Sequence, residues 1–128
     1  MDKNTIHHDV ELKNFNSWKV GGRAEHFLIC DEKAILASLI KKNKIKLPIT
    51  FVGLGSNLLI RDGGIKGTVI VMNGGLGKIN NDNDLIYSEA GVSCSKLSKF
   101  SAKHGLAKSA FFSGIPGTVG GALAMNAG

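Results

Sequence analysis

A glycine-rich reversal between two apolar runs constrains the fold of this chain more than any other feature. Residues 51–60 read F-V-G-L-G-S-N-L-L-I. We interpret Phe51 and Val52 as the end of a buried strand and residues 58–60 as the start of the next, so residues 53–57 would reverse the chain tightly. Glycines at positions 53 and 55 permit positive φ, and they let a ligand approach the backbone where no Cβ intervenes.

This loop has the composition of an anion site. Successive backbone N–H groups in such a turn form an anion-binding concavity, and the Ser56 hydroxyl and Asn57 amide add side-chain donors. A diphosphate would suit these donors. An ordinary turn between two strands is the alternative that the loop alone leaves open.

A second glycine-rich stretch lies near the end of the sequence. Residues 111–122 read F-F-S-G-I-P-G-T-V-G-G-A. Pro116 suits the first turn of a helix, and a helix starting there would direct free N–H groups and a partial positive charge at a ligand. The small side chains leave space either for a large flat ligand or for close backbone packing, and the stretch alone leaves both interpretations open.

Two common nucleotide-binding motifs are excluded by residue type. The dinucleotide fingerprint needs a glycine three residues after Gly55, where Leu58 stands. A P-loop needs Lys-Ser or Lys-Thr after its last glycine, and neither stretch has that pair. The chain is therefore neither a Rossmann nor a P-loop binder.

Three segments in one order carry a resemblance to a known family: residues 16–24 (N-S-W-K-V-G-G-R-A), residues 53–67 and residues 113–128. They resemble the UDP-N-acetylenolpyruvoylglucosamine reductases (UDP-N-acetylmuramate dehydrogenases), flavoenzymes of bacterial peptidoglycan precursor synthesis. Members of that family are more than twice as long as this chain. The resemblance implies an α+β, two-subdomain FAD-binding fold of the vanillyl-alcohol oxidase / p-cresol methylhydroxylase type, truncated at its C-terminus.

The resemblance also implies a domain organisation and a set of cofactor contacts. Residues 1–13 would be a loose arm, 14–72 the first FAD-binding subdomain and 73–128 an incomplete second one, with no substrate domain. FAD would bind tightly and non-covalently. The implied FAD-binding residues are Gly53, Leu54, Gly55, Ser56, Asn57, Leu58, Gly114, Ile115, Pro116, Gly117, Thr118, Gly120, Gly121 and Asn126.

The implied reaction is the NADPH-dependent reduction of UDP-N-acetylglucosamine enolpyruvate to UDP-N-acetylmuramate, with FAD carrying the hydride. The family's catalytic serine, carboxylate and arginine, and its UDP-sugar contacts, would follow residue 128, so this chain holds no catalytic residue and would be inactive alone. Two alternatives stay open: another FAD-dependent oxidoreductase of the same fold, and a non-catalytic nucleotide or flavin binder.

Composition narrows the environment and the partners. The net charge is +6, and no acidic residue follows Glu89, whereas four lysines do, so a basic half facing an anionic ligand is expected. Those lysines are Lys96, Lys99, Lys103 and Lys108. Nucleic acid is not an expected partner, because basic residues are not interleaved with aromatics. Two cysteines without metal spacing, no export signal and no apolar run long enough for a bilayer favour a cytoplasmic protein without a metal or a membrane partner.

The remaining pattern predicts further local structure. We expect a strand at residues 26–30, then a helix capped by Asp31 and stopped by Pro48, with Ile35, Leu36, Leu39 and Ile40 on its inner face. That helix and the strand at 49–53 suggest a parallel crossover.

Strands are also expected at residues 67–72 and 85–90, with a long turn at 73–84 between them. A second helix is expected after the cap Ser93. Trp18 reads as a core plug or as a wall of the flavin site, and the plug is favoured.

Overall fold

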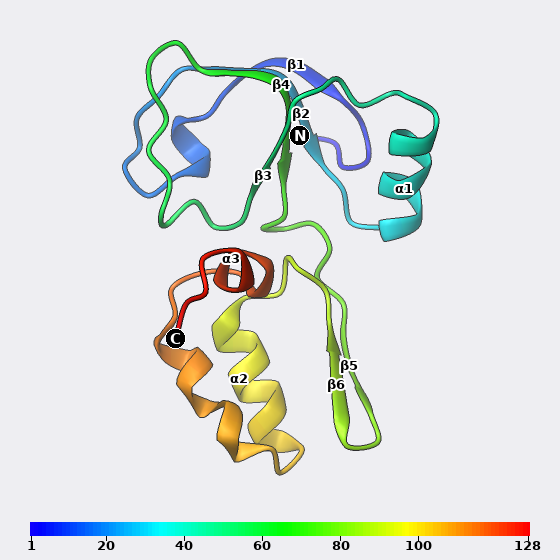
Figure 1. Cartoon of the computed structure of the whole chain (residues 1–128), viewed down its shortest axis with the longest axis vertical. Helices are drawn as coiled ribbons and strands as arrows, with labels where there is room; N and C mark the ends of the chain where they lie inside the picture. The colour runs from blue at the N-terminus through cyan, green and yellow to red at the C-terminus, as the bar shows by residue number, and fades with distance from the viewer.

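A four-stranded sheet with one α-helix forms one half of the molecule, and a two-stranded ribbon with the remaining helices forms the other (Figure 1). This computed structural model describes all residues from 1 to 128. The first half contains β1 (His7–Glu11), η1 (Lys13–Phe15), β2 (Arg23–Ile29), α1 (Lys33–Lys41), β3 (Ile49–Val52) and β4 (Ile65–Val71). The second contains β5 (Ile79–Asp82), β6 (Leu85–Ser88), α2 (Cys94–Lys103), η2 (Ala107–Gly114) and α3 (Val119–Ala124). The α+β class predicted from the sequence is confirmed.

The larger sheet has the strand order β1-β2-β4-β3, in which β1 pairs antiparallel and the other neighbours pair parallel. Because side chains alternate along a strand, β2 and β4 serve both faces of the sheet. Phe27 and Val69 belong to one buried cluster, and Leu28 and Ile70 belong to another, against which α1 packs. The predicted parallel crossover is confirmed: α1 connects β2 to β3, and β4 lies between these two strands in the sheet.

The ends of α1 differ from the prediction. Glu32 precedes its first turn with no side-chain cap, because the Asp31 carboxylate instead accepts a 2.7 Å hydrogen bond from Asn4 Nδ2. The helix ends at Lys41, and Pro48 lies seven residues further on, directly before β3. On its predicted inner face Ile35, Leu36 and Leu39 pack against the core, whereas Ile40 is exposed.

The prediction of a loose arm over residues 1–13 is wrong. Residues 7–11 form β1 with a continuous register against β2, and Leu12 is fully buried. Further out, the backbone N–H of Asn4 donates to the Ile29 carbonyl at 2.8 Å. Residues of β1 are exposed or only half-buried, with no alternation along the strand, so a search for period-2 patterning does not reveal it. The structure contains no group of three or more potential metal ligands.

The second half is built on a hairpin that the sequence did not predict. Residues 79–82 were assigned to a long turn, but they pair antiparallel with β6, and Asn83 takes the positive φ that the reversal needs. After the hairpin, Ser93 caps α2 as predicted: its hydroxyl accepts the Lys96 N–H at 3.1 Å. The core of this half is a small cluster of Val92, Leu97 and Val119.

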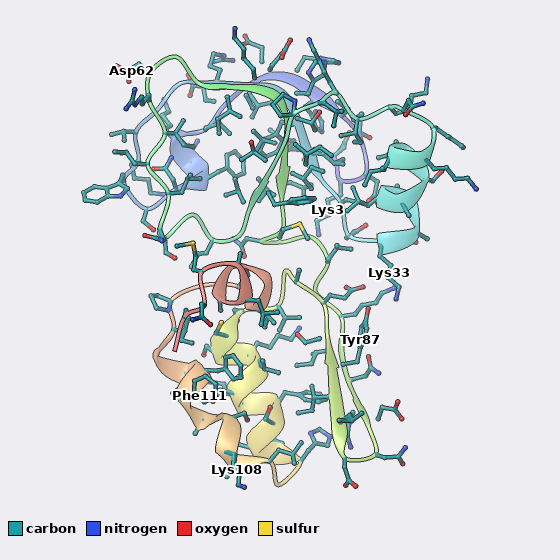
Figure 2. All side chains as sticks on the ribbon, viewed as in Figure 1. Lys3, Lys33, Asp62, Tyr87, Lys108 and Phe111 are labelled. Carbon is teal, nitrogen blue, oxygen red and sulfur yellow. The ribbon has the colours of Figure 1, made fainter.

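The two halves touch at two places outside the glycine-rich stretches. The Leu76 N–H donates to the Cys30 carbonyl at 3.0 Å, close to where the chain passes between the halves. Figure 2 shows Lys33 on α1 and Tyr87 on β6 directed toward one another, and their Nζ and hydroxyl atoms lie 3.2 Å apart. No helix in the structure combines the length and the hydropathy required to cross a bilayer.

Candidate functional site

The two glycine-rich stretches predicted from sequence face each other across a cleft of about 560 Å³. One wall is the loop after β3 and the other is the chain around the start of α3, which lies beneath that loop in Figure 1. The lining residues are Phe51, Val52, Gly53, Leu54, Gly55, Ser56, Asn57, Leu58, Ile115, Pro116, Gly117, Thr118, Gly121, Ala122, Ala124, Met125 and Ala127. None of them carries a titratable side chain, so the cleft is neutral and partly apolar.

The first wall, residues 53–58, is called the 53–58 loop below. None of its six backbone N–H groups donates a hydrogen bond within the chain, to either a carbonyl or a side chain. The predicted strand at 58–60 is absent: Ile60 is buried in the core, whereas Leu59 is exposed. The loop is therefore a stretch of unpaired donors rather than a turn between two strands.

Gly53 and Gly55 are required for different reasons. Gly55 has φ +75°, and a Cβ there would lie 2.2 Å from the Phe15 carbonyl oxygen. Gly53 does not have positive φ, contrary to our expectation for both glycines; a Cβ at Gly53 would instead lie 2.5 Å from Thr118 Oγ1 on the opposite wall. The first glycine thus allows the two walls to approach, and the second allows the loop to turn.

The second wall, residues 114–121, is called the 114–121 segment. Its helix does not begin at Pro116 as predicted: α3 starts at Val119, and Thr118 is the cap, with its hydroxyl accepting the Gly121 N–H at 3.2 Å. The N–H groups of Val119 and Gly120 donate to the carbonyls of Val92 and Ala90. The expectation that this helix presents free donors to a ligand is therefore wrong for residues 119–121, because their N–H groups already donate within the chain.

Eleven of the fourteen predicted site residues line the cleft, and three do not. Gly120 faces the other way, since a Cβ there would lie 2.7 Å from the Ala90 Cβ. Gly114 ends η2 in the open, with nothing within 4 Å of an added Cβ. Asn126 is exposed at φ +50°, and the cleft takes its neighbours Met125 and Ala127 instead.

The charged and aromatic residues that the sequence singles out lie outside the cleft. None of the four lysines after Glu89 lines it, so the expected basic half does not face this site. Trp18 is 67% exposed, which contradicts the core-plug interpretation.

The groups with shifted pKa values also lie outside the cleft. Hydrogen bonds from Lys46 and from the Gly67 N–H lower the pKa of Glu25. A hydrogen bond from Lys13 lowers the pKa of Glu11, and burial raises the pKa of the Cys94 thiol.

Residues that sequence reasoning missed fall into two groups. Six of them line the cleft, and their apolar character next to the glycine motifs was the available signal: Phe51, Val52, Ala122, Ala124, Met125 and Ala127. Asn16 and Ser17 lie behind the 53–58 loop, where the Ser17 N–H donates to the Gly55 carbonyl at 3.0 Å. Nothing in the spacing of the two segments, nearly forty residues apart, indicated that contact.

The arrangement fits a large anionic ligand with an apolar part. Unpaired backbone N–H groups at one wall can receive a diphosphate, and the small residues of the other wall leave room for a planar group. A Cβ at Gly117 would be 3.9 Å from Ser56 Oγ, so the walls stay close without touching at that point. FAD has both a diphosphate and a planar ring system, which makes it a chemically suitable occupant.

Comparison with known proteins agrees with this geometry. A family model described as an FAD binding domain matches residues 25–128. The reductase named UDP-N-acetylenolpyruvoylglucosamine reductase from Nitrosospira multiformis is 45% identical over 127 residues, covering 96% of this chain and 37% of its own length. The protein of the same name from Nitrosococcus oceani is 48% identical, with 96% and 42% covered.

A third relative with that name, from Alkalilimnicola ehrlichii, is 43% identical over 123 residues. It is covered over 41% of its length, so the chain spans about two fifths of the curated relatives that it matches. The family model covers most of the chain, both glycine-rich walls included. The chain belongs to the family of FAD-binding domains.

Proposed function

We propose that this chain supplies the FAD-binding part of a reductase that converts UDP-N-acetylglucosamine enolpyruvate to UDP-N-acetylmuramate with NADPH as hydride donor. The observation that carries the proposal is the 53–58 loop: its six N–H groups are unpaired, and its residues line a cleft whose other wall is made mostly of small residues. The name shared by the relatives supplies the substrate and the reaction type.

The residues of the cleft have separate tasks in this proposal. The backbone of the 53–58 loop would bind the diphosphate, because backbone donors at a glycine-rich turn are already oriented toward an anion. The Ser56 hydroxyl and Asn57 amide, which make no hydrogen bond within the chain, would add two donors. Ile115, Gly117, Gly121 and Ala122 would contact the planar part and exclude water.

When bound, FAD would carry hydride between the nicotinamide and the enolpyruvyl group. The cleft holds no acid, base or nucleophile, since none of its lining residues titrates. Substrate binding and protonation are therefore assigned to the portion of the relatives that this chain does not span. A division into subdomains near residue 72 and a cytoplasmic location belong to the same proposal; two free, buried cysteines support the location.

The test is an FAD titration of the purified chain, followed by flavin fluorescence, with inorganic pyrophosphate and riboflavin as separate competitors. Saturable FAD binding that pyrophosphate weakens is expected. Binding that only riboflavin weakens would contradict the assignment of the loop to the diphosphate. Absence of any flavin binding by a folded chain would contradict the proposed function itself.

A second assay separates the reductase from the alternatives. NADPH oxidation with FAD and UDP-N-acetylglucosamine enolpyruvate is measured for residues 1–128 and for a chain extended to the relatives' length. We expect turnover only from the longer chain. Equal rates would place the proton donor within residues 1–128, and turnover on a different enoyl substrate alone would favour another flavin oxidoreductase.

A further inference from the structure

Residues behind the 53–58 loop, and not in the cleft, hold that loop in place. Across residues 53–58 only one backbone atom takes part in a hydrogen bond within the chain: the Gly55 carbonyl, which accepts the Ser17 N–H at 3.0 Å. The side chains of Ser56 and Asn57 form none. A loop whose N–H groups must stay free for a ligand cannot be fixed by hydrogen bonds that those groups donate. This one backbone hydrogen bond from another segment therefore fixes it.

The contact comes from a segment, residues 12–20, that is itself fixed by one buried amide. Asn16 is 2% exposed, and its Nδ2 donates to the Leu12 and Val20 carbonyls at 2.9 Å each, joining the two ends of the segment. The backbone of Asn16 also touches the loop, because a Cβ on Gly55 would lie 2.7 Å from its Cα. One side chain thus connects the shape of the 12–20 segment to the position of Gly55.

Asn16 carries a further sign of a specialised role. Its Oδ1 is buried and has no hydrogen-bond partner, although an unpaired buried acceptor is costly and most buried polar atoms are paired. The orientation of the amide is fixed by the two bonds of Nδ2, so a flip would not satisfy the oxygen without breaking both of them. Local unfavourable features of this kind are concentrated at functional sites.

We propose that Asn16 and Ser17 are positioning residues for the diphosphate-binding loop, acting from behind it through the Gly55 carbonyl. This inference rests on the proposed function of the loop. Neither side chain needs to touch FAD: Asn16 holds the 12–20 segment, Ser17 holds the Gly55 carbonyl, and the N–H groups of the loop thereby stay directed at the cleft. Removing the tether lets the loop sample other conformations, which lowers the apparent affinity by the fraction of molecules that remain competent.

The proposal is tested with a substitution that breaks the tether. Ser17 is the second residue of a β-turn closed by the Lys19 N–H and the Asn16 carbonyl, a position that favours proline, and Asn16 has extended backbone (φ −143°, ψ 156°), as a residue before proline requires. Ser17→Pro therefore deletes the N–H donor at a turn position that accepts proline, and its Cδ, in the place of the N–H hydrogen, also displaces the Gly55 carbonyl from its present position. Asn16→Ala is the companion variant that loosens the whole segment.

The matched control is Asp62→Pro. Asp62 occupies the same position in another turn, closed by the Gly64 N–H and the Arg61 carbonyl, and its own N–H donates to nothing. It lies at the end of the first half that faces away from the second (Figure 2), so it is far from the second wall of the cleft. Any general effect of a new proline would appear in this control.

Two measurements keep the inference separate from the proposed function. Backbone order parameters of residues 53–58 are measured by NMR without FAD, and FAD affinity is measured by titration. For Ser17→Pro we expect the order parameters to fall from about 0.85 to below about 0.6, and FAD affinity to fall about tenfold. The thermal midpoint should match that of Asp62→Pro, and Asp62→Pro should leave both loop order and affinity unchanged.

Each result has a defined meaning. If the loop stays ordered in Ser17→Pro, the tether does not position it and the inference is overturned, whatever happens to FAD. If the loop loosens but FAD affinity is unchanged, the positioning role for the cofactor is overturned. If no protein binds FAD while the loop still loosens, the proposed function fails and the structural tether stands. If Asn16→Ala does not fold, the Ser17→Pro data decide alone.

Discussion

The two walls of the cleft are both rich in glycine, yet their backbones are in opposite states. In the 53–58 loop every N–H is unpaired, whereas from Val119 to Ala122 every N–H donates within the chain. The glycines differ in the same way: Gly55 permits a turn that exposes donors, and Gly120 permits α3 to pack on Ala90. Similar composition thus supports binding in one wall and packing in the other.

Under the proposed function, this difference gives most of the donors for the anion to one wall. A helix start attracts phosphate through unpaired N–H groups, and at α3 the Thr118 hydroxyl and the chain at residues 90–92 have taken those of residues 119–121, which leaves only the Thr118 N–H unpaired. The 114–121 segment contributes shape, and the 53–58 loop contributes polarity. Each of the following predictions tests this division.

Gly53→Val should produce the largest effect. Its Cβ would lie within 2.5 Å of Thr118 Oγ1, so the walls must separate. We expect FAD binding to weaken by about 3 kcal/mol, or roughly a hundredfold. Flavin retained per protein after gel filtration is the measurement, and Gly63→Val, where an added Cβ meets nothing within 4 Å, is the control. A folded Gly53→Val protein with wild-type flavin content would show that the walls do not act together.

Gly120→Val should act on stability and not on the binding donors. The new side chain would collide with Ala90, and we expect the free energy of unfolding to drop by about 1–3 kcal/mol. Gly114→Val, in open space, should stay within about 0.5 kcal/mol of wild type. Denaturant midpoints measure both. Equal midpoints would mean that Gly120 is not a packing glycine, and the distinction between the walls would be lost.

Thr118→Val removes the hydroxyl that accepts the Gly121 N–H. The expected loss is about 1 kcal/mol of folding stability, as for other helix caps. Thr118→Ser keeps the hydroxyl and should restore most of that loss in a thermal melt. Should Thr118→Val bind FAD more tightly than wild type, the freed N–H would be an anion donor, and the second wall would join the first in binding.

The smallest effect is expected from pH. No titratable side chain lines the cleft, so FAD affinity should stay constant between pH 6 and 8 in fluorescence titrations, within about twofold. Stability should change at the two extremes: burial raises the pKa of the Cys94 thiol, so stability falls in alkali as pH rises above the ordinary thiol pKa, and it also falls in acid. The pKa of Glu25 is lowered by Lys46 and Gly67, so its stabilisation is present above its ordinary pKa of roughly 4.3 and is lost as pH falls through the lowered value. Affinity that follows a pKa near neutrality would point to an unrecognised charged contact.

Local signals in the sequence were sufficient for some elements and not for others. The Ser93 cap and the apolar face of α1 were predictable because they depend on neighbours within one turn of helix. The strands β1 and β5 were missed because their residues, H-H-D-V-E and I-N-N-D, have no strand pattern and are held only by a partner strand.

The same reasoning explains the outcome at the site. Glycine positions in the 53–58 loop are visible in the sequence, and the unpaired N–H groups of the loop agree with the donor-rich turn that they suggest. Whether the N–H groups after Pro116 are free depends on the carbonyls of Val92 and Ala90, about thirty residues away. Pairing partners of that kind are set by tertiary structure, and so the helix start was misassigned, with Thr118 as the actual cap.

A loop that is proposed to bind mainly through its main chain has a consequence for how the sequence can change over time. Most substitutions replace the side chain and leave the peptide N–H in place, so Leu54 can vary while the backbone donors of the loop persist. Gly53 and Gly55 cannot vary in this way, because at those positions the opposite wall and the turn leave no room for a side chain. What must be retained at this site is therefore the backbone conformation of the loop. Two glycines determine that conformation, together with residues elsewhere in the chain that do not contact the ligand.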